Sequence, residues 1–472
     1  MPVSHAALAA SVPMLWDEVT TEVAAGRRLA DLFATARPDG LLLTAHLAGE
    51  HDLVTREALV PPGESGYPAL TPRLAAAFWY EREIAEVFGV RPAGYPRPEP
   101  LLLAGSATPH VSGPGMFTIP HGPVRSGVME SIEYLVETPG EDIPHLDMRV
   151  FYKHRGIEKR FEGQRAADGV LLAERTEGIA SVAHALAYCH AIEEIAGVPV
   201  PRAAATLRVL HAELERLACH LDVIVRLADG AGLAVATARF GWHKEQVLRL
   251  VGRLCGSRFG RGVVIPGGVA REPLLRSAEL MTAAGRIDQR LSADLRLLMG
   301  TSSFLDRLRR TGPLRPSRAT EHGALGPVGR ASDRREDIRA ARPYDGYADL
   351  PVTVAHRPQG DAMARLEVRV AEIEQSFALI AEVAGGLDQA DAGPMSVPCR
   401  PAEGRATGWA EAPQGEVLYD VRLSDGVISR CRARSASFHN LVLMPEVFVG
   451  DILTDFPFIE ASFGLSVAGV SR

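Results

Sequence analysis

The sequence predicts an α+β protein, with a small N-terminal α/β domain followed by a large, mainly helical domain that carries peripheral β-strands. Its 472 residues are 46% hydrophobic, which is enough to bury a large core and to form more than one domain. Apolar residues recur with helical spacing from about residue 170 onwards, and strand-like runs bounded by turn residues lie on both sides of that region.

The first 104 residues read as the α/β unit. The run "LLLTAHLA", residues 41–48, is apolar and strand-like. A helix is expected over residues 71–90, "TPRLAAAFWYEREIAEVFGV", with Thr71 as its cap and Pro72 in its first turn. The Pro-rich and Gly-rich stretches that follow place a boundary near residues 104–116. The expected domains are therefore residues 1–104 and 117–472.

The second region begins with strands and continues with helices. Two strands are expected on either side of the "PGED" turn at residues 139–142. One helix is predicted by a leucine-rich stripe with spacings of three and four, from Leu207 to Ile224. Further helices are expected at 240–256, 275–299 and 360–385. Residues 312–359 are rich in Pro, Gly and charge, so they are expected to form a long connecting segment.

Near the C-terminus a β-hairpin is expected after Trp409, with its turn at Ser424–Gly426. Residues 332–342, "SDRREDIRAAR", mix both signs of charge, and we expect them to be solvated or at a subunit interface.

Composition excludes several functional classes. The formal net charge of −7 disfavours nucleic acid as a partner. No apolar run reaches the roughly 18 residues of a membrane-spanning helix, so a soluble chain is expected. Five cysteines without a CxxC pair indicate free, buried thiols in a reducing compartment, and not an Fe–S cluster held by this chain alone. Neither a P-loop nor a GxGxxG fingerprint is visible.

Several stretches together resemble one superfamily. It unites the large subunit of [NiFe] hydrogenases with the quinone-site subunit of respiratory complex I. The stretches occur in the family's order, and they begin with "HGPVRSGVMESIEYLVETPGE" and the HRGxEK turn in "FYKHRGIEK". They continue with the long core helix "VPVPRAAATLRVLHAELERLACHLD", "IPGGVA", "GPVGRASDRREDIRAARPYDGY", "GWAEAPQGEVLYDV" and "DFPFIEASFGLSVAGVSR".

The N-terminal stretch "FWYEREIAEVFGV" resembles the small complex I subunit that lies beside the quinone-site subunit. A fusion of the two is the arrangement of the formate-hydrogenlyase and hydrogenase-4 type of large subunit. The resemblance implies that residues 1–104 form a domain like the small complex I subunit and residues 117–472 a [NiFe]-hydrogenase-like domain. The chain stops at Arg472, the family's usual mature end, which favours a chain made without a cleaved tail.

The resemblance also implies where metal ligands would stand. Active hydrogenases of the family hold nickel and iron with four thiolates from two CxxC pairs, because soft thiolates suit these metals. Here the early pair falls on Glu177 and Ala180, and the late pair on Ser466 and Gly469. One carboxylate and one hydroxyl do not replace four thiolates, so no metal is expected in this chain.

The quinone-binding positions of the complex I branch are also changed. The resemblance places its histidine on Met129 and its tyrosine on Gly178, and neither side chain can donate a hydrogen bond to a quinone carbonyl. Both could line an apolar cavity.

Two other acidic residues match family positions. Glu158 corresponds to a residue beside the metal cavity, where it could pass protons if burial raised its pKa; the alternative is an ion pair with Arg155 or Lys159. Glu130 would lie at the cavity mouth or be a surface carboxylate. His184 is interpreted as a hydrogen-bonded core histidine, and Arg175 as the partner of a carboxylate.

Two functions therefore stay open. The first is a large hydrophilic subunit of a complex I-like or group 4 hydrogenase-like oxidoreductase, beside an Fe–S small subunit with a [4Fe–4S] cluster and with quinone as a candidate acceptor. The second is a catalytically decayed subunit that joins the Fe–S arm to proton-translocating membrane subunits. In both, the chain is expected to be cytoplasmic and held on the inner face of the membrane by its partners.

Overall fold

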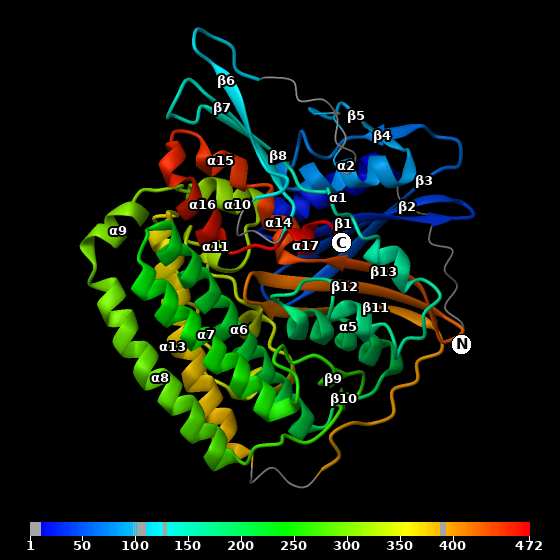
Figure 1. Cartoon of the computed structure of the whole chain (residues 1–472). Coiled ribbons are helices and arrows are strands. Elements are labelled where there is room, and N and C mark those ends of the chain that lie inside the picture. The colour runs from blue at the N-terminus through cyan, green and yellow to red at the C-terminus, as the bar shows by residue number, and fades with distance from the viewer. Residues whose placement is uncertain (1–10, 98, 100, 102–109, 126–129, 388–392) are drawn as a thin grey trace.

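The computed structural model describes residues 11–97, 99, 101, 110–125, 130–387 and 393–472. The fold contains many helices and several small sheets, which confirms the predicted α+β class. A bundle of long helices occupies one side of the molecule, and three small antiparallel sheets with shorter helices occupy the other (Figure 1).

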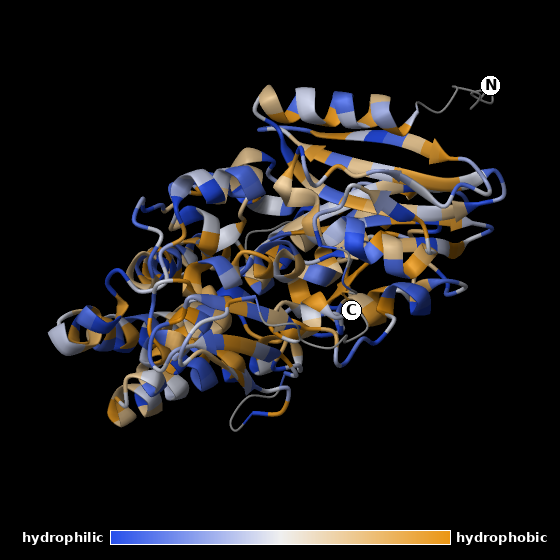
Figure 2. Cartoon of the chain, turned by 90° about the horizontal axis from the view of Figure 1, so that it is seen from above, coloured by the Kyte–Doolittle hydropathy of each residue, from blue (hydrophilic) through white to orange (hydrophobic). Residues whose placement is uncertain are grey.

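The N-terminal unit consists of a three-stranded sheet covered by a helix. The antiparallel strands β1 (Arg28–Arg37), β2 (Gly40–Ala48) and β3 (Leu53–Val60) lie in that order, which confirms the predicted strand at 41–48. Helix α1 (Val12–Ala24) packs on them with Leu15, Trp16 and Val19 buried. Its hydrophobic face is turned towards the sheet and its hydrophilic face outwards (Figure 2).

The predicted helix at 71–90 begins later than expected. A short turn, η1 (Ala75–Ala77), precedes α2 (Phe78–Phe88), which is flanked by the parallel strands β4 (Gly66–Pro68) and β5 (Arg91–Ala93). Thr71 does not cap the helix. Its hydroxyl and its backbone N–H donate to the buried carboxylate of Glu81, at 2.6 and 2.8 Å, and the N–H of Leu70 donates to the other oxygen at 2.8 Å, so the carboxylate is satisfied inside the core.

A second sheet follows the boundary region. It is antiparallel and contains β6 (Phe117–His121), β7 (Glu133–Thr138) and β8 (His145–Arg149), so the strands expected around the "PGED" turn are confirmed. Two short helices come next, α3 (Ile157–Phe161) and α4 (Val170–Ala173).

The helical bundle matches the predicted periodicity. Its long helices are α6 (Arg202–Gly230), α7 (Ala234–Cys255), α8 (Ser277–Met299) and α13 (Ala362–Gly386). Helix α5 (Ser181–Ala196) lies outside this bundle and packs mainly against the strands of residues 404–424 (Figure 1). The predicted leucine stripe from Leu207 to Ile224 is buried on α6, which contacts α7 and α13. Shorter elements at its edge are β9 (Val264–Ile265), β10 (Gly268–Val269) and α9 (Ser302–Leu308).

Residues 312–359 do not form the open connecting segment that the sequence suggests. They contain the short elements α10 (Pro316–His322), α11 (Gly326–Arg330), α12 (Ile338–Ala341) and η2 (Asp345–Asp349). The stretch "SDRREDIRAAR", expected to be solvated or at a subunit interface, is only partly solvated. Asp333, Arg335 and Glu336 are exposed, whereas Asp337, Arg339 and Arg342 are buried. Their opposite charges are paired inside the protein, which offsets the cost of removing them from water.

The C-terminal region supplies the third sheet and the end of the chain. The antiparallel strands are β11 (Gly404–Ala412), β12 (Gly415–Ser424) and β13 (Val427–Arg434), and the predicted hairpin turns at Asp425, with φ of 52°. The remaining elements are short: α14 (Ala436–Leu441), α15 (Met444–Phe448), η3 (Leu453–Asp455), α16 (Phe456–Phe463) and α17 (Val467–Val470).

One hydrophobic core connects the N-terminal unit with the C-terminal elements. It combines Trp16 and Leu43 with Tyr134, Ile459 and Phe463 in one continuous cluster of buried side chains. Cores of this kind hold their elements in fixed positions because interiors are packed as densely as organic crystals. The end of the chain therefore lies between β1 and β13, close to the early turn at residues 174–180 (Figure 1).

Candidate functional site: a remodelled metal-ligand position

The positions that correspond to the metal ligands of the family, Glu177 and Ala180 in the early turn and Ser466 and Gly469 near the C-terminus, lie together in the structure. We call them the former ligand site, and the two pairs are its halves. Glu177 lies in the turn before α5, and Gly469 lies in α17, almost three hundred residues later. The two are in direct contact, since a Cβ atom built on Gly469 would lie 2.7 Å from Oε2 of Glu177. Ala180 is fully buried at the start of α5, and its N–H donates to the carbonyl of Glu177 at 3.2 Å.

Ser437 of α14 links Glu177 to Ser466. Its hydroxyl donates to Oε1 of Glu177 at 2.6 Å and accepts the backbone N–H of Ser466 at 3.0 Å. One hydroxyl thereby connects the early turn with the C-terminal segment, using both its donor and one of its acceptor sites.

A buried polar chain continues from Glu177 into the core. Oε2 of Glu177 lies 3.1 Å from Nε2 of His184, and Nδ1 of His184 lies 2.9 Å from the hydroxyl of Tyr419 on β12. That hydroxyl also lies 3.1 Å from the hydroxyl of Thr176. All four side chains are buried, and burial raises the pKa of Tyr419 far above its usual range, so the phenol stays neutral. The interpretation of His184 as a hydrogen-bonded core histidine is confirmed.

Two charged side chains hold the halves together from outside. The guanidinium of Arg155 donates to the carbonyl groups of Thr176 and Ala468, each at 2.6 Å. The carboxylate of Glu130 accepts the N–H groups of Val467 at 2.7 Å and Ala468 at 3.1 Å, together with the hydroxyl of Ser466. Glu130 is half-buried and binds the first residues of α17, so it is not a free surface carboxylate.

A nickel–iron centre held by four thiolates does not fit this arrangement. None of the four positions carries sulfur, and the carboxylate of Glu177 fills the space directly in front of Gly469. Its oxygens already bind Ser437 and His184. The five cysteines form no disulfide and stand at other positions, Cys189, Cys219, Cys255, Cys399 and Cys431. The donor set is that of a buried hydrogen-bonded carboxylate, not that of a soft-metal site.

Of the two expected quinone positions, Met129 and Gly178, the structure describes only Gly178. Met129 lies outside the described residues. Gly178 is exposed, and a Cβ atom built there would meet nothing within 4 Å. It lines a small cavity of about 90 Å³ together with Ile179, His211 and Glu215.

Two titratable groups of this cavity were missed as site residues in the sequence. His211 and Glu215 are four residues apart on α6, a spacing that puts both on one helix face. Burial raises the pKa of Glu215 to about 8, although the N–H groups of Val182 and Ala183 donate to its carboxylate. Burial lowers the pKa of His211 to about 4. At neutral pH both groups are mainly uncharged, which suits an apolar cavity.

Glu158 does not have the property that a proton-carrying role would require. Its carboxylate contacts Arg430 at 3.0 Å, Arg432 at 3.2 Å and Arg472 at 2.9 Å, and not the predicted partners Arg155 or Lys159. Burial alone would raise the pKa of Glu158, but the three guanidinium groups outweigh burial and hold it well below the usual range. Glu158 is therefore a permanently ionised anchor for the C-terminal arginine. Arg175 pairs with Glu174, as expected, at 3.3 Å.

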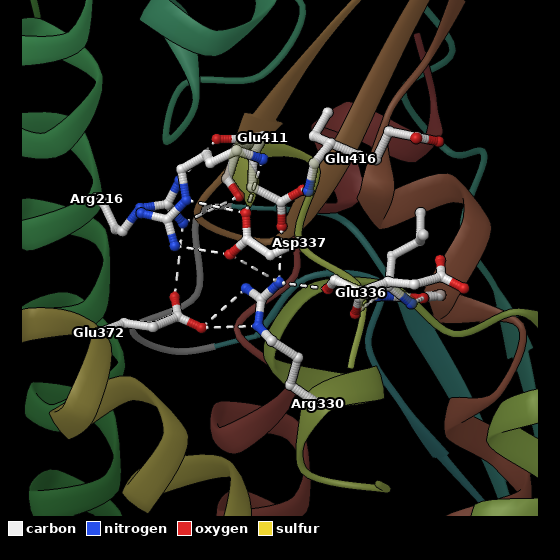
Figure 3. Close-up of polar contacts among 12 residues, drawn as sticks. Arg216, Arg330, Glu336, Asp337, Glu372, Glu411 and Glu416 are labelled. Carbon is white, nitrogen blue, oxygen red and sulfur yellow. Dashed lines mark hydrogen bonds and ion pairs between the residues drawn. The ribbon is translucent and has the colours of Figure 1, made fainter. Parts of the chain in front are cut away.

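A larger network of buried charges lies beside the site, between the helical bundle and β11 (Figure 3). Arg330 of α11 is its centre. The guanidinium contacts Glu372 of α13 at 2.8 Å, Glu411 of β11 at 2.9 Å and Asp337 at 3.3 Å. Nε2 of His220 on α6 lies 2.8 Å from Glu372. All of these side chains are at most 3% exposed, and no sequence motif had marked them as a group.

The charges in this network are strongly coupled. Burial would raise the pKa of Asp337, but Arg339 and Arg330 hold it well below the usual range. Burial and the neighbouring Asp337 raise the pKa of Glu411. The charge of Asp337 is therefore stabilised by its arginine neighbours, whereas the pKa of Glu411 is raised although Arg330 contacts it.

Comparison with known families decides the relationship. The family model for the respiratory-chain NADH dehydrogenase 49 kDa subunit matches residues 233–400 and 395–472, together just over half of the chain. This chain belongs to that family. The model for the 30 kDa subunit of the same enzyme matches residues 3–115, so the two family segments are fused in one chain.

Individual relatives come from hydrogenase and complex I-type enzymes. Formate hydrogenlyase subunit 5 of Escherichia coli is 29% identical over 450 residues, covering 87% of this chain and 77% of the relative. An NADH-quinone oxidoreductase subunit of Carboxydothermus hydrogenoformans is 30% identical over 365 residues, covering 74% of this chain and 96% of the relative.

A solved structure shares the fold. It is that of the membrane-bound sulfane sulfur reductase, an archaeal respiratory membrane complex; one of its chains superposes with a TM-score of 0.72 at 24% identity and covers 76% of this chain. Within the described part of this family member, no helix combines the length and apolar character needed to cross a bilayer.

Proposed function

We propose that this chain is the large hydrophilic subunit of a membrane-attached oxidoreductase complex of the complex I or group 4 hydrogenase type, without a [NiFe] centre of its own. The relatives whose names include formate hydrogenlyase, hydrogenase-4 and NADH-quinone oxidoreductase support the kind of complex. The contact between Glu177 and Gly469 carries the second part of the proposal, because it puts a hydrogen-bonded carboxylate where thiolates would bind metal.

The proposal includes a partner with an Fe–S cluster. A small subunit of the complex I or hydrogenase type would lie beside the early turn and supply a [4Fe–4S] cluster, since this chain offers no cysteine set for one. Electrons from that cluster would pass to an acceptor at this interface. Quinone is the candidate acceptor, and the exposed Gly178 and the cavity behind it are where its ring would have to bind. The complex would sit on the cytoplasmic face of the membrane through its membrane subunits.

A second function has its own supporting observation. The network around Arg330 joins α6, α11, α13 and β11 through buried charges, and such a network can transmit a change of protonation between distant elements. In this alternative the chain is catalytically decayed, and it couples the Fe–S arm to proton-translocating membrane subunits.

Both functions place the chain in a membrane-attached complex with an Fe–S partner. Purification of a tagged chain from detergent-solubilised membranes of its host tests this. Co-purification of an Fe–S protein and of integral membrane subunits is expected. A chain that is found only in the soluble fraction, without partners, contradicts the proposal.

A density map of that purified complex, prepared with added quinone, separates the two functions. A headgroup-sized ligand beside Gly178, together with quinone reduction by the complex, supports the oxidoreductase function. A site filled by side chains of the partner, with no quinone reduction, supports the coupling function.

A further inference from the structure

Three side chains with metal-binding atoms converge on the sheet of β6, β7 and β8, away from the former ligand site. Oε1 of Glu137 lies 3.4 Å from Nδ1 of His110 and 3.5 Å from Nδ1 of His145. The two imidazole rings are 4.4 Å apart between centroids. One donor atom from each residue lies within 4.8 Å of the other two.

The secondary structure holds two of these groups in place. Glu137 and His145 are directly opposite each other in the antiparallel pair of β7 and β8, so their side chains share one face of the sheet. The carboxylate of Glu137 also accepts the backbone N–H groups of His110 at 2.8 Å and Val111 at 2.6 Å. The third group is thereby attached to the same carboxylate through its own main chain.

We propose that His110, Glu137 and His145 form a binding site for one divalent transition-metal ion, with zinc as the ion best matched to it. Two imidazole nitrogens and one carboxylate oxygen form a known ligand set for zinc, with a water molecule completing the tetrahedron. Bonds of about 2.0–2.2 Å in a tetrahedron put neighbouring ligand atoms about 3.3–3.5 Å apart. The separations of 3.4 and 3.5 Å match that spacing before any ion is bound.

The donor atoms and their surroundings suit such an ion. Among the described residues, Nδ1 of His145 is buried without a hydrogen-bond partner. Hard ions such as magnesium are disfavoured, because they prefer oxygen ligands.

The position of the site indicates its effect. The side chains of His110 and His145 are 36% and 26% exposed, so an ion can enter from solvent and keep a water ligand. His110 lies on the connection between the N-terminal unit and β6, whereas the other two ligands lie on the sheet. A bound ion would therefore fasten this connection to β7 and β8.

Zinc titration of the full-length chain, after removal of metals with a chelator, tests the proposal. A chromophoric chelator present as competitor measures the affinity, and X-ray absorption measures the ligand set. One zinc ion per chain is expected at this site, with two imidazole nitrogens among the atoms bound to it.

Two variants identify the site, and a third serves as the control. His110→Ala and His145→Ala should each weaken zinc binding at least tenfold. His51→Ala removes a histidine whose side chain is 75% exposed and should leave zinc binding unchanged. Thermal melting of the metal-free variants shows whether they are folded. Absence of one-to-one binding, or equal zinc affinity in the wild-type chain and in folded His110→Ala, overturns the proposal.

Discussion

At the scale of single residues, the former metal position has been rebuilt as a compact hydrogen-bonded site. Glu177 supplies a carboxylate, Gly469 supplies the space for it, and Ser437 and His184 complete its hydrogen bonds. Because each of these groups is buried, losing one of them leaves its partners unsatisfied, at about 1–3 kcal/mol for each neutral group.

Gly469→Ala should destabilise the protein by about 1–3 kcal/mol, the usual cost of an added methyl group in a packed core. The new Cβ atom would lie 2.7 Å from Oε2 of Glu177. Urea unfolding measures the change. Gly241→Ala on α7 is the control, because its Cβ meets nothing within 4 Å and alanine favours a helix. Equal stability of Gly469→Ala and the wild type would show that the two halves do not touch.

The raised pKa of Glu215 should make the free energy of unfolding depend on pH. Its pKa in the folded chain is raised to about 8, so the folded state binds this proton more tightly than the unfolded state does. The protein should therefore lose stability as the pH rises from about 4.5 to 8, by up to about 5 kcal/mol through this group. Glu215→Gln should remove that part of the slope, whereas Glu374→Gln, at an exposed position on α13, should leave it. Parallel pH profiles for wild type and Glu215→Gln would refute the raised pKa.

Sequence alone reached only part of this site. Glu177, Ala180, Ser466 and Gly469 could be located because they occupy motif positions. Ser437 and Tyr419 could not, since each is more than 230 residues away from its partner and lies outside the ligand motifs. Their role depends on the packing of α14 and β12 against the early turn, which no local pattern encodes.

At the scale of elements, long and short helices differ in how well the sequence predicts them. The helices α6, α7, α8 and α13 follow from apolar periodicity. Helices of four to seven residues, such as α10, α11 and α12, are too short to be stable by themselves and form because tertiary contacts hold them. The burial of Arg339 and Arg342 was missed for the same reason, because their partners Glu213 and Glu416 are far away in the chain.

Glu130→Ala tests the element that closes the site, α17. The substitution removes the acceptor for two backbone N–H groups and for the hydroxyl of Ser466, so the last seven residues should loosen. Amide exchange of residues 466–472 should become at least tenfold faster, and the melting temperature should fall. Glu50→Ala, at a side chain that is 83% exposed, provides the comparison. Unchanged exchange in Glu130→Ala would mean that Glu130 does not secure the C-terminus.

At the scale of the whole molecule, the N-terminal unit and the larger region are joined by charges as well as by a common core. Arg432 of β13 contacts Asp31 of β1 at 3.0 Å and Glu83 of α2 at 2.7 Å. The ring of Trp79 packs against Phe438, with 5.7 Å between centroids. The sequence predicts the N-terminal strand and helix, and it predicts that "FWYEREIAEVFGV" packs beside the larger region, which the contact of Trp79 with Phe438 confirms. The distant partners in the shared core could not be predicted from a local pattern.

Arg432→Ala should destabilise the whole chain by about 3–5 kcal/mol, because it leaves the buried carboxylate of Asp31 without its counter-charge. Arg73→Ala breaks an exposed pair with Asp17 and should cost at most about 1 kcal/mol. Chemical denaturation followed by far-UV circular dichroism compares the two. A stable Arg432→Ala chain that unfolds in two separate steps would show that the N-terminal unit is independent.

We propose that this family member works in a membrane-attached complex without a nickel–iron centre. Elemental analysis of the intact, detergent-purified complex, with nickel and iron counted for each copy of this chain, tests this proposal. We expect iron in the amounts that Fe–S clusters of partner subunits require and no stoichiometric nickel, because Glu177, Ala180, Ser466 and Gly469 offer none of the four thiolates of a nickel–iron centre. About one nickel ion for each copy of the chain would contradict this expectation.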